Sequence, residues 1–201
     1  MSGAATVVAA ILVGYLLGTF PTAVLVTRLA TRGSVDIRAA GSGNPGGVNT
    51  AHVVGRAWGG VVIAVDVLKG IGAGLLGWVI AGPVGAYSGA TAAIAGHIWP
   101  VWAHFRGGKG VATSAGAVIA VFPAFFPLDA AAAAVGALAL RNAERAMQLS
   151  STVWVVASFT WWLAALPTLW GPNPSVALPI TQTIGAAMIL GKFYQSRPRP
   201  A

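Results

Sequence analysis

The chain has 201 residues, of which 56% are hydrophobic and only 8% are charged. A soluble globular domain carries about a quarter charged residues, so this composition excludes an ordinary soluble protein and predicts an all-α, polytopic membrane protein. The net charge of +8 comes from cations that gather between apolar runs, which favours membrane topology over nucleic-acid binding as its cause. Cysteine is absent, which excludes thiol and disulfide chemistry.

Apolar runs of roughly 20 residues mark membrane-spanning helices. We expect about seven of them within a single domain, residues 1–201. The predicted spans are at about 4–27, 58–80, 84–104, 110–123, 126–140, 151–170 and 175–192. The fourth and fifth runs are short and meet at Pro123 and Pro127, so one broken helix or a re-entrant pair is the alternative. The first run has no basic leader and is too long for a signal peptide, which indicates a span.

Basic residues follow the first, third, fifth and seventh predicted spans. They are Arg28, Arg32, Arg38, Arg56, Arg106, Lys109, Arg141, Arg145, Lys192, Arg197 and Arg199. The connections at 81–83, 123–127 and 171–174 carry no charge. Because cytoplasmic loops are enriched in Lys and Arg, we expect the N-terminus outside and the C-terminus in the cytoplasm. Merging the fourth and fifth spans would place the last two basic groups outside, which favours seven spans.

The first polar segment is rich in glycine. Residues 41–49 read Gly-Ser-Gly-Asn-Pro-Gly-Gly-Val-Asn, with Arg38 before them and Arg56 after them. Glycine lets the backbone approach a ligand closely, and exposed N–H groups beside cations are typical of a phosphate cradle. A flexible loop between helices is the alternative interpretation.

A second glycine-rich segment, Arg106-Gly107-Gly108-Lys109, stands where the fourth span is expected to begin. A helix N-terminus carries free N–H groups and partial positive charge, so two cations there would favour an anion. The glycine spacing is not that of a Walker A loop. The alternative is a basic anchor with a tight turn. The topology places both glycine-rich segments on the cytoplasmic side.

Three polar residues lie inside predicted spans. Asp66 and Lys69 are three apart and share a helix face; intramembrane charges mark functional sites by default, and a structural ion pair is the alternative. His97 suits a hydrogen bond to phosphate or a proton transfer, with a packing role as the alternative. The few histidines and carboxylates form no persuasive metal set or Ser-His-Asp arrangement. We therefore expect no metal and no cofactor.

Four segments, taken in their order along the chain, resemble the PlsY family of bacterial membrane glycerol-3-phosphate acyltransferases. They are residues 41–49, 66–70, 96–101 and 105–113. The resemblance implies an enzyme of the bacterial inner membrane with its active site facing the cytoplasm. Its substrates would be acyl-phosphate and glycerol 3-phosphate, and its products lysophosphatidic acid and phosphate. It implies membrane lipids as neighbours and no nucleic acid. The oligomeric state does not follow from the sequence.

The resemblance also implies roles for individual residues. The catalytic residues would be Ser42, His97 and Lys109. The substrate- and phosphate-binding residues would be Gly41, Gly43, Asn44, Gly46, Gly47, Asn49, His52, Lys69, Arg106, Gly107 and Gly108.

The sequence departs from the family pattern in three places. Val48 stands where the family usually has Thr, His52 stands where it usually has Arg, and the C-terminal motif of the family is not recognisable. The alternative function is therefore a paralogue that binds a phosphorylated lipid without catalysis or uses another acceptor. A small transporter is disfavoured, because the polar residues concentrate at one membrane surface and not at its middle.

Overall fold

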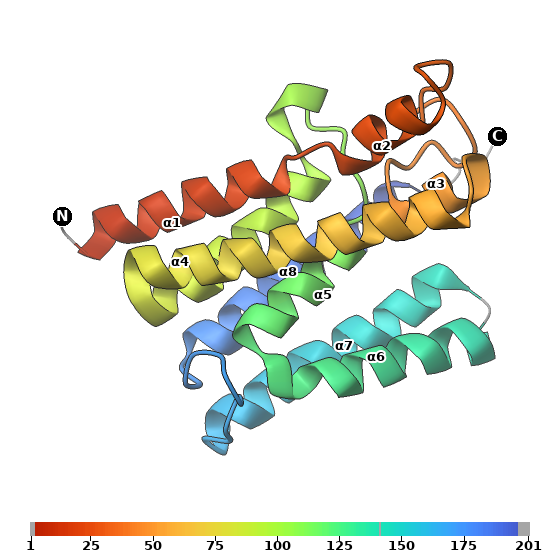
Figure 1. Ribbon diagram of the computed structural model, residues 1–201. Coiled ribbons are helices and arrows are strands. Elements are labelled where there is room, and N and C mark those ends of the chain that lie inside the picture. Colours follow the sequence, from red (N-terminus) through yellow and green to blue (C-terminus); the bar gives the residue numbers. More distant parts are fainter. Residues whose placement is uncertain (1–2, 141, 197–201) are drawn as a thin grey trace.

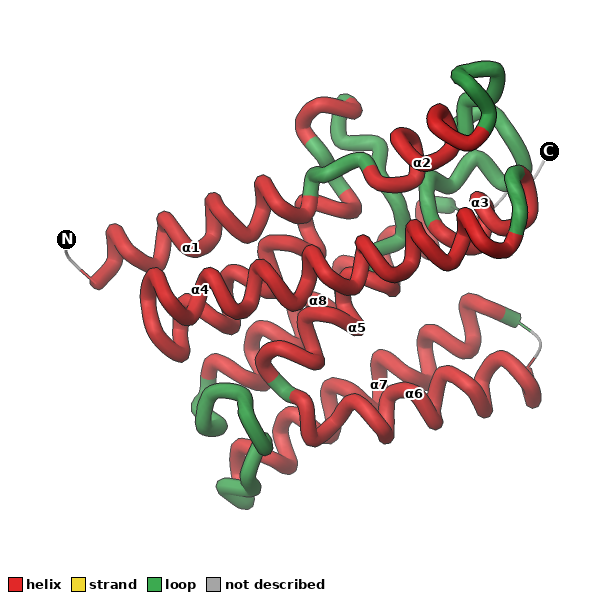
Figure 2. The backbone as a smooth tube through the Cα atoms, in the orientation of Figure 1, coloured by secondary structure: helices red, strands yellow, loops and turns green. Residues whose placement is uncertain are grey.

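A computed structural model shows the chain as a bundle of α-helices (Figures 1 and 2). It describes residues 3–140 and 142–196, among which no strand occurs. The helices are α1 (Gly3–Gly18), α2 (Thr22–Ala30), α3 (Gly47–Val53), α4 (Arg56–Ile98), α5 (Val111–Val121), α6 (Phe126–Val135), α7 (Ala143–Leu163) and α8 (Ala177–Gln195). Short turns of other helical types are η1 (Val101–Ala103), η2 (Pro123–Phe125) and η3 (Gly136–Leu140). The all-α prediction is confirmed; Arg141, Arg197 and Arg199 lie outside the described residues.

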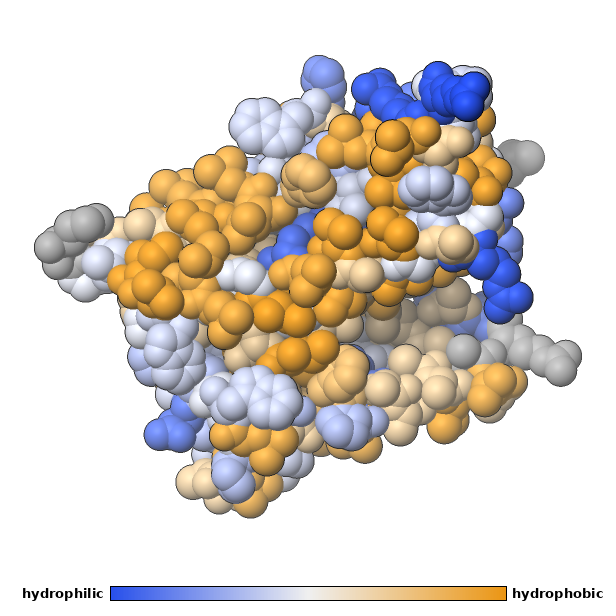
Figure 3. Space-filling model, in the orientation of Figure 1, coloured by the Kyte–Doolittle hydropathy of each residue, from blue (hydrophilic) through white to orange (hydrophobic). Residues whose placement is uncertain are grey.

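The surface of the bundle is apolar where a membrane would surround it. Two helical stretches, Gly3–Ala30 and Arg56–Ala103, are long and apolar enough to cross a bilayer. The helices Val111–Val121 and Pro123–Val135 meet that requirement only as a pair, and they are bent by 119° where they meet. Figure 3 shows hydrophobic side chains over the outer faces of α1 and α4, and the most hydrophilic atoms near the end that carries α2 and α3. An exposed apolar surface of this extent requires lipid or a partner to cover it.

The first predicted span, 4–27, is interrupted. α1 ends at Gly18, and the helix resumes only at Thr22. Pro21 explains the break, because proline cannot donate a backbone hydrogen bond and disfavours helical geometry in the residue before it. The Phe20 carbonyl consequently faces the interior, where it accepts hydrogen bonds from the Thr22 N–H (2.9 Å) and the Lys69 ammonium (3.3 Å).

α4 consists of two antiparallel arms that correspond to the predicted spans 58–80 and 84–104. Its backbone leaves helical geometry at Ala81 and Gly82, and the helix reverses direction there (Figure 1). Gly77 and Gly85 face each other so closely that neither has room for a Cβ atom. The second arm ends at Ile98 and not at 104, because Pro100 disfavours continuation of the helix.

Small residues let α1 pack directly on the second arm of α4. Gly14 meets the backbone of Gly89, and Gly18 meets that of Ala93, with no space for a side chain at either glycine. This close approach of backbones is the usual way in which helices associate within a membrane. A buried aromatic and aliphatic core then joins the same arm of α4 to α5, α7 and α8.

The later helices follow the predicted spans with shifted ends. α5 begins and ends close to the predicted 110–123, and α6 with η3 covers 126–140. α7 occupies 143–163 in place of the predicted 151–170, because the Asn142 side chain caps its start by accepting from the N–H groups of Glu144 and Arg145. The described chain begins and ends at opposite ends of the bundle (Figure 1).

Candidate anion-binding site

The first glycine-rich segment forms a compact loop that enters α3. Gly41 and Gly43 have φ values of +59° and +70°, a region that glycine adopts without steric cost. The loop bonds to itself: the Gly43 N–H donates to the Ala40 carbonyl (3.0 Å), and the Gly46 N–H donates to the Asn44 carbonyl (2.9 Å). These backbone donors, which the sequence offered as a cradle for phosphate, are therefore engaged within the loop.

Asn49 fastens this loop from within α3. Its side chain is 4% exposed; Nδ2 donates to the carbonyls of Ile37 (3.2 Å) and Ala40 (3.0 Å), and Oδ1 accepts from the Ser42 N–H (2.9 Å). All three bonds join α3 to the connection between α2 and α3, which contains no regular helix. The position of Ser42 therefore depends on Asn49.

Replacing Asn49 by Ala should lower the free energy of unfolding by about 2 kcal/mol, because the backbone groups of Ile37, Ala40 and Ser42 lose the hydrogen bonds that they make to this buried side chain. Thermal unfolding in detergent measures this loss, and hydrogen exchange at the Ser42 amide should accelerate. Asn44→Ala is the matched control, because Asn44 is only partly buried and lines an open pocket. Equal stability of the two variants would contradict the fastening role of Asn49.

An open pocket of about 790 Å³ lies beside the loop. It is lined by Arg38, Ser42, Gly43, Asn44, Pro45, Ala103, His104, Arg106, Gly107, Lys109, Lys192 and Ser196. Its basic residues come from four parts of the fold: the α2–α3 connection, the turn after η1, the start of α5, and the last turn of α8. None of these lining residues is acidic. Such a concentration of one sign of charge attracts anions.

Lys109 is the basic residue of this pocket that lies nearest to the start of α5, separated from it by Gly110. Its Nζ lies 4.1 Å from the centroid of the Phe193 ring in α8, within the range of a cation–π interaction. Partial burial lowers the pKa of Lys109 below the ordinary 10.5, and the charge of Glu144 on α7 opposes that shift. Lys109 is thus held against α8 at the pocket wall.

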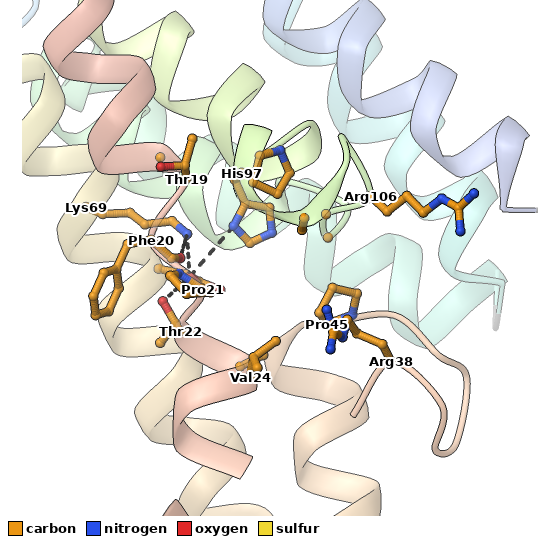
Figure 4. A pocket seen from close by; sticks show the side chains of 17 residues that line it. Thr19, Phe20, Pro21, Thr22, Val24, Arg38, Pro45, Lys69, His97 and Arg106 are labelled. Carbon is orange, nitrogen blue, oxygen red and sulfur yellow. Dashed lines mark hydrogen bonds and ion pairs between the residues drawn. The ribbon is translucent and has the colours of Figure 1, made fainter. Parts of the chain in front are cut away.

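A narrow inner cavity of about 40 Å³ adjoins the outer pocket and shares Arg38, Pro45 and Arg106 with it. Its deeper wall is formed by the break between α1 and α2 and by polar residues of both arms of α4. Figure 4 shows the Lys69 and His97 side chains directed toward the same place beside Thr22.

That place is the Asp66 carboxylate. Its Oδ1 accepts from the Thr22 hydroxyl (2.9 Å) and from the Lys69 ammonium (2.9 Å), and lies 3.7 Å from His97 Nδ1. Asp66, Lys69 and His97 are 2%, 8% and 9% exposed. Because a buried charge is stable only when it is paired and hydrogen-bonded, we treat these four residues as one polar network, called the Asp66 network below.

The second glycine-rich segment packs on the end of α4. The Gly108 N–H donates to the His97 carbonyl (3.1 Å), and the Gly107 N–H donates to the Ile98 carbonyl (3.0 Å). A Cβ atom at Gly107 or Gly108 would collide with His97 or its neighbours. These glycines bring Arg106 and Lys109 to the pocket, while their own N–H groups serve the turn.

The structure gathers most of the predicted site residues around the two cavities. Those that line one or both are Ser42, Gly43, Asn44, Lys69, His97, Arg106, Gly107, Gly108 and Lys109. Those that line neither are Gly41, Gly46, Gly47, Asn49 and His52. His52 is exposed on α3.

Sequence reasoning passed over other lining residues. Thr19 and Thr22 flank the break between α1 and α2 and line the inner cavity. The sequence feature that could have predicted this break is Pro21, which stands inside an apolar run. Arg38 appeared only as a neighbour of the first loop, and Lys192 only as a charge that sets topology. Asp66 was noted for its spacing to Lys69 without a predicted place in the site.

Fold and site together define an all-helical membrane protein with a basic pocket at the end of its bundle. The chain belongs to the family described as Glycerol-3-phosphate acyltransferase, whose sequence profile matches residues 8–198. The resemblance found in the four motifs is therefore confirmed.

Relatives and solved structures agree with this assignment. The chain is 47% identical to Glycerol-3-phosphate acyltransferase 2 of Moorella thermoacetica over 114 residues, which cover 57% of this chain and 58% of that protein. It is 37% identical to Glycerol-3-phosphate acyltransferase of Halorhodospira halophila over 162 residues, 79% of each chain. The first of these alignments thus spans less than two thirds of the relative.

The fold is similar to that of PlsY, described as an integral membrane glycerol 3-phosphate acyltransferase. Its glycerol 3-phosphate form matches with a TM-score of 0.74 and 28% identity, over 94% of this chain and 88% of that one. Its lysophosphatidic acid form matches with a TM-score of 0.75 and 26% identity over the same shares. The similarity includes the C-terminal half, where the sequence motifs were not recognisable.

Proposed function

We propose that the protein transfers a fatty acyl group from acyl-phosphate to the sn-1 hydroxyl of glycerol 3-phosphate. The observation that carries the proposal is the convergence of Arg38, Arg106, Lys109 and Lys192 on one pocket. Both substrates bear a phosphate, and one basic pocket beside an apolar, lipid-facing surface suits a phosphorylated molecule with a fatty chain. The names and bound forms of the relatives support the same reaction.

In the proposed reaction the sn-1 hydroxyl oxygen attacks the acyl carbonyl carbon. The bond from that carbon to the phosphate oxygen breaks, and the hydroxyl proton passes to the departing phosphate, which is the base. Lys109 and Arg106 stabilise the charge on the phosphate as it leaves, which lowers the barrier without a protein nucleophile. Holding both substrates in one pocket supplies proximity.

Ser42 and Asn44 face the same space and offer neutral hydrogen-bond donors to phosphoryl oxygens. Lys69 and His97 lie deeper, in the Asp66 network at the wall of the inner cavity. We assign Ser42, His97 and Lys109 to catalysis and the other lining residues to substrate binding. Asn49 contributes through the position of Ser42.

The assay that tests this function uses the purified protein in detergent with acyl-phosphate and glycerol 3-phosphate. We expect phosphate and lysophosphatidic acid in equal amounts. Phosphate release without lysophosphatidic acid would indicate a different acceptor. Absence of both products, in a preparation shown to be folded, would overturn the enzymatic function.

The pH profile of this assay should depend on Lys109. Because its pKa is lowered by burial, its charge is lost on the alkaline side at a pH below the ordinary 10.5 of lysine, and the rate should fall there. In Lys109→Arg the guanidinium stays charged throughout, so this alkaline limb should move to higher pH. An unchanged limb in an active Lys109→Arg variant would show that another group causes it.

We further propose that the chain crosses the bacterial inner membrane seven times, with the site in the cytoplasm. The two arms of α4 and the separate helices α1, α5, α6, α7 and α8 supply seven segments, and the opposite placement of the termini suits an odd number of crossings. The basic residues near the site agree with the excess of Lys and Arg in cytoplasmic loops.

Single cysteines provide the topology test, because the chain has no cysteine of its own. Ser34→Cys in the α2–α3 connection should be protected from a membrane-impermeant maleimide in intact spheroplasts. Asn173→Cys, in the exposed loop between α7 and α8, should be labelled. The reverse pattern would invert the proposed orientation, and labelling of both would contradict the number of crossings.

A further inference from the structure

The last turn of α8 enters the outer pocket although no motif marks it. Lys192 and Ser196 line the pocket together with Ser42, Arg106 and Lys109. Lys192 is partly buried, and the helix is still wound around it, because the Ser196 N–H donates to the Lys192 carbonyl (3.1 Å). A cation from the end of the chain therefore lies in the same space as the two glycine-rich segments.

Core packing holds this turn in place. Phe193 is 8% exposed and belongs to the central hydrophobic core, together with Ile98 and Val118. The ring of Phe193 also carries the Lys109 ammonium at 4.1 Å from its centroid. Because Phe193 is anchored on both counts, the backbone of the adjacent Lys192 is held at the wall of the pocket that Lys192 lines.

Two of the other cations of the pocket, Arg38 and Lys109, already have partners. Arg38 forms a double hydrogen bond with Asp36 (3.0 and 2.9 Å), and Lys109 rests on Phe193 and senses the charge of Glu144. Among the described residues, no carboxylate forms an ion pair with Lys192. Lys192 thus retains its hydrogen-bonding capacity for a ligand.

The charge of the substrates calls for such a group. A phosphate monoester carries a charge of about −1.5 to −2 at pH 7, so the two substrates of the proposed reaction would bring two such groups into one space. Arg106 and Lys109, both in the second glycine-rich segment, supply enough positive charge to balance one phosphate. A second phosphate requires a cation from another wall of the pocket.

Building on the proposed function, we infer that Lys192 is a direct phosphate ligand and that the last turn of α8 completes the anion site. The ligand chemistry is a phosphate monoester, which either substrate presents. Lys192 thus supplies, in this chain, a binding group from α8 that the four sequence motifs do not contain.

Binding of inorganic phosphate tests the ligand directly. Titration calorimetry on the purified protein should show that Lys192→Met weakens phosphate binding by roughly tenfold or more, as for loss of a hydrogen bond to a charged group. Lys192→Arg should restore most of it. Arg145→Met is the matched control, since it removes the same charge from a residue that lines neither cavity, and it should bind like the parent. Equal phosphate affinity in Lys192→Met and the parent, with equal unfolding temperatures, would overturn the inference.

Kinetics then identify the substrate and separate this inference from the proposed function. If Lys192→Met raises the KM for only one of the two substrates, glycerol 3-phosphate or acyl-phosphate, the inference is supported. That substrate is then the one whose phosphate Lys192 binds. Unchanged KM values for both substrates in an active Lys192→Met enzyme overturn it and leave the acyltransferase function standing. If the parent binds phosphate but transfers no acyl group, and Lys192→Met loses that phosphate binding, the phosphate site is supported and the proposed acyltransferase function is overturned.

Discussion

Lys109→Met should lower the rate constant of acyl transfer by roughly 10²- to 10³-fold, the usual effect of removing one preorganised donor at a developing charge. Methionine keeps most of the length and the apolar bulk of the side chain, so the loss reports mainly the charge. Lys109 lines the open pocket close to the start of α5, where the leaving phosphate would accumulate charge. Steady-state release of phosphate and lysophosphatidic acid measures the effect.

The matched control for this variant is Arg28→Met, which removes an exposed cation from α2 that lines neither cavity. Its rate should stay within about twofold of the parent, since a remote surface charge is largely screened at physiological salt. If Lys109→Met and Arg28→Met had similar rates, Lys109 would not be part of the reacting centre. A raised KM for acyl-phosphate with an unchanged rate constant would instead assign Lys109 to ground-state binding.

Local sequence signals predicted much of this fold. The predicted break at residues 81–83 is the reversal at Ala81 and Gly82, in keeping with the backbone preferences of glycine and proline. The end of α4 before Pro100 has the same kind of cause, but the predicted span continued to residue 104. Pro21 carried the same kind of signal, but the apolar residues around it made one continuous span the simpler prediction. The break inside this span can be understood only from the side chains that hydrogen-bond to it. Lys69 donates to the Phe20 carbonyl, and Asp66 accepts from the Thr22 hydroxyl.

The candidate site was predictable in its composition and less so in its geometry. The glycines of residues 41–47 suggested free N–H groups, yet neighbouring carbonyls accept from the Gly43 and Gly46 N–H groups, and the Asn49 side chain accepts from the Ser42 N–H. Which donors stay free depends on how a loop folds, and residue types do not determine that. Lys192 was unrecognisable as a pocket residue, because only the packing of Phe193 in the core brings α8 to Lys109.

The Asp66 network leads to the second large effect. Asp66→Ala should lower the free energy of unfolding by about 3–5 kcal/mol, because it leaves the Lys69 ammonium buried without its counter-charge. Both side chains are nearly inaccessible, at 3% and 6% exposure. Unfolding in detergent against a denaturant measures the loss. Asp36→Ala is the control, since the Asp36–Arg38 pair is exposed, and it should change stability far less.

A double variant decides whether the pair serves only the fold. Asp66→Leu combined with Lys69→Met removes both charges and keeps apolar volume, so stability should recover to near that of the parent. If Lys69 also binds substrate, as its place in the inner cavity indicates, the double variant should stay at least tenfold less active despite its restored stability. Recovery of both stability and activity would show a purely structural ion pair. The two interpretations of Asp66 and Lys69 that the sequence left open thus differ in one measurable quantity, the activity of a stable protein that lacks both charges.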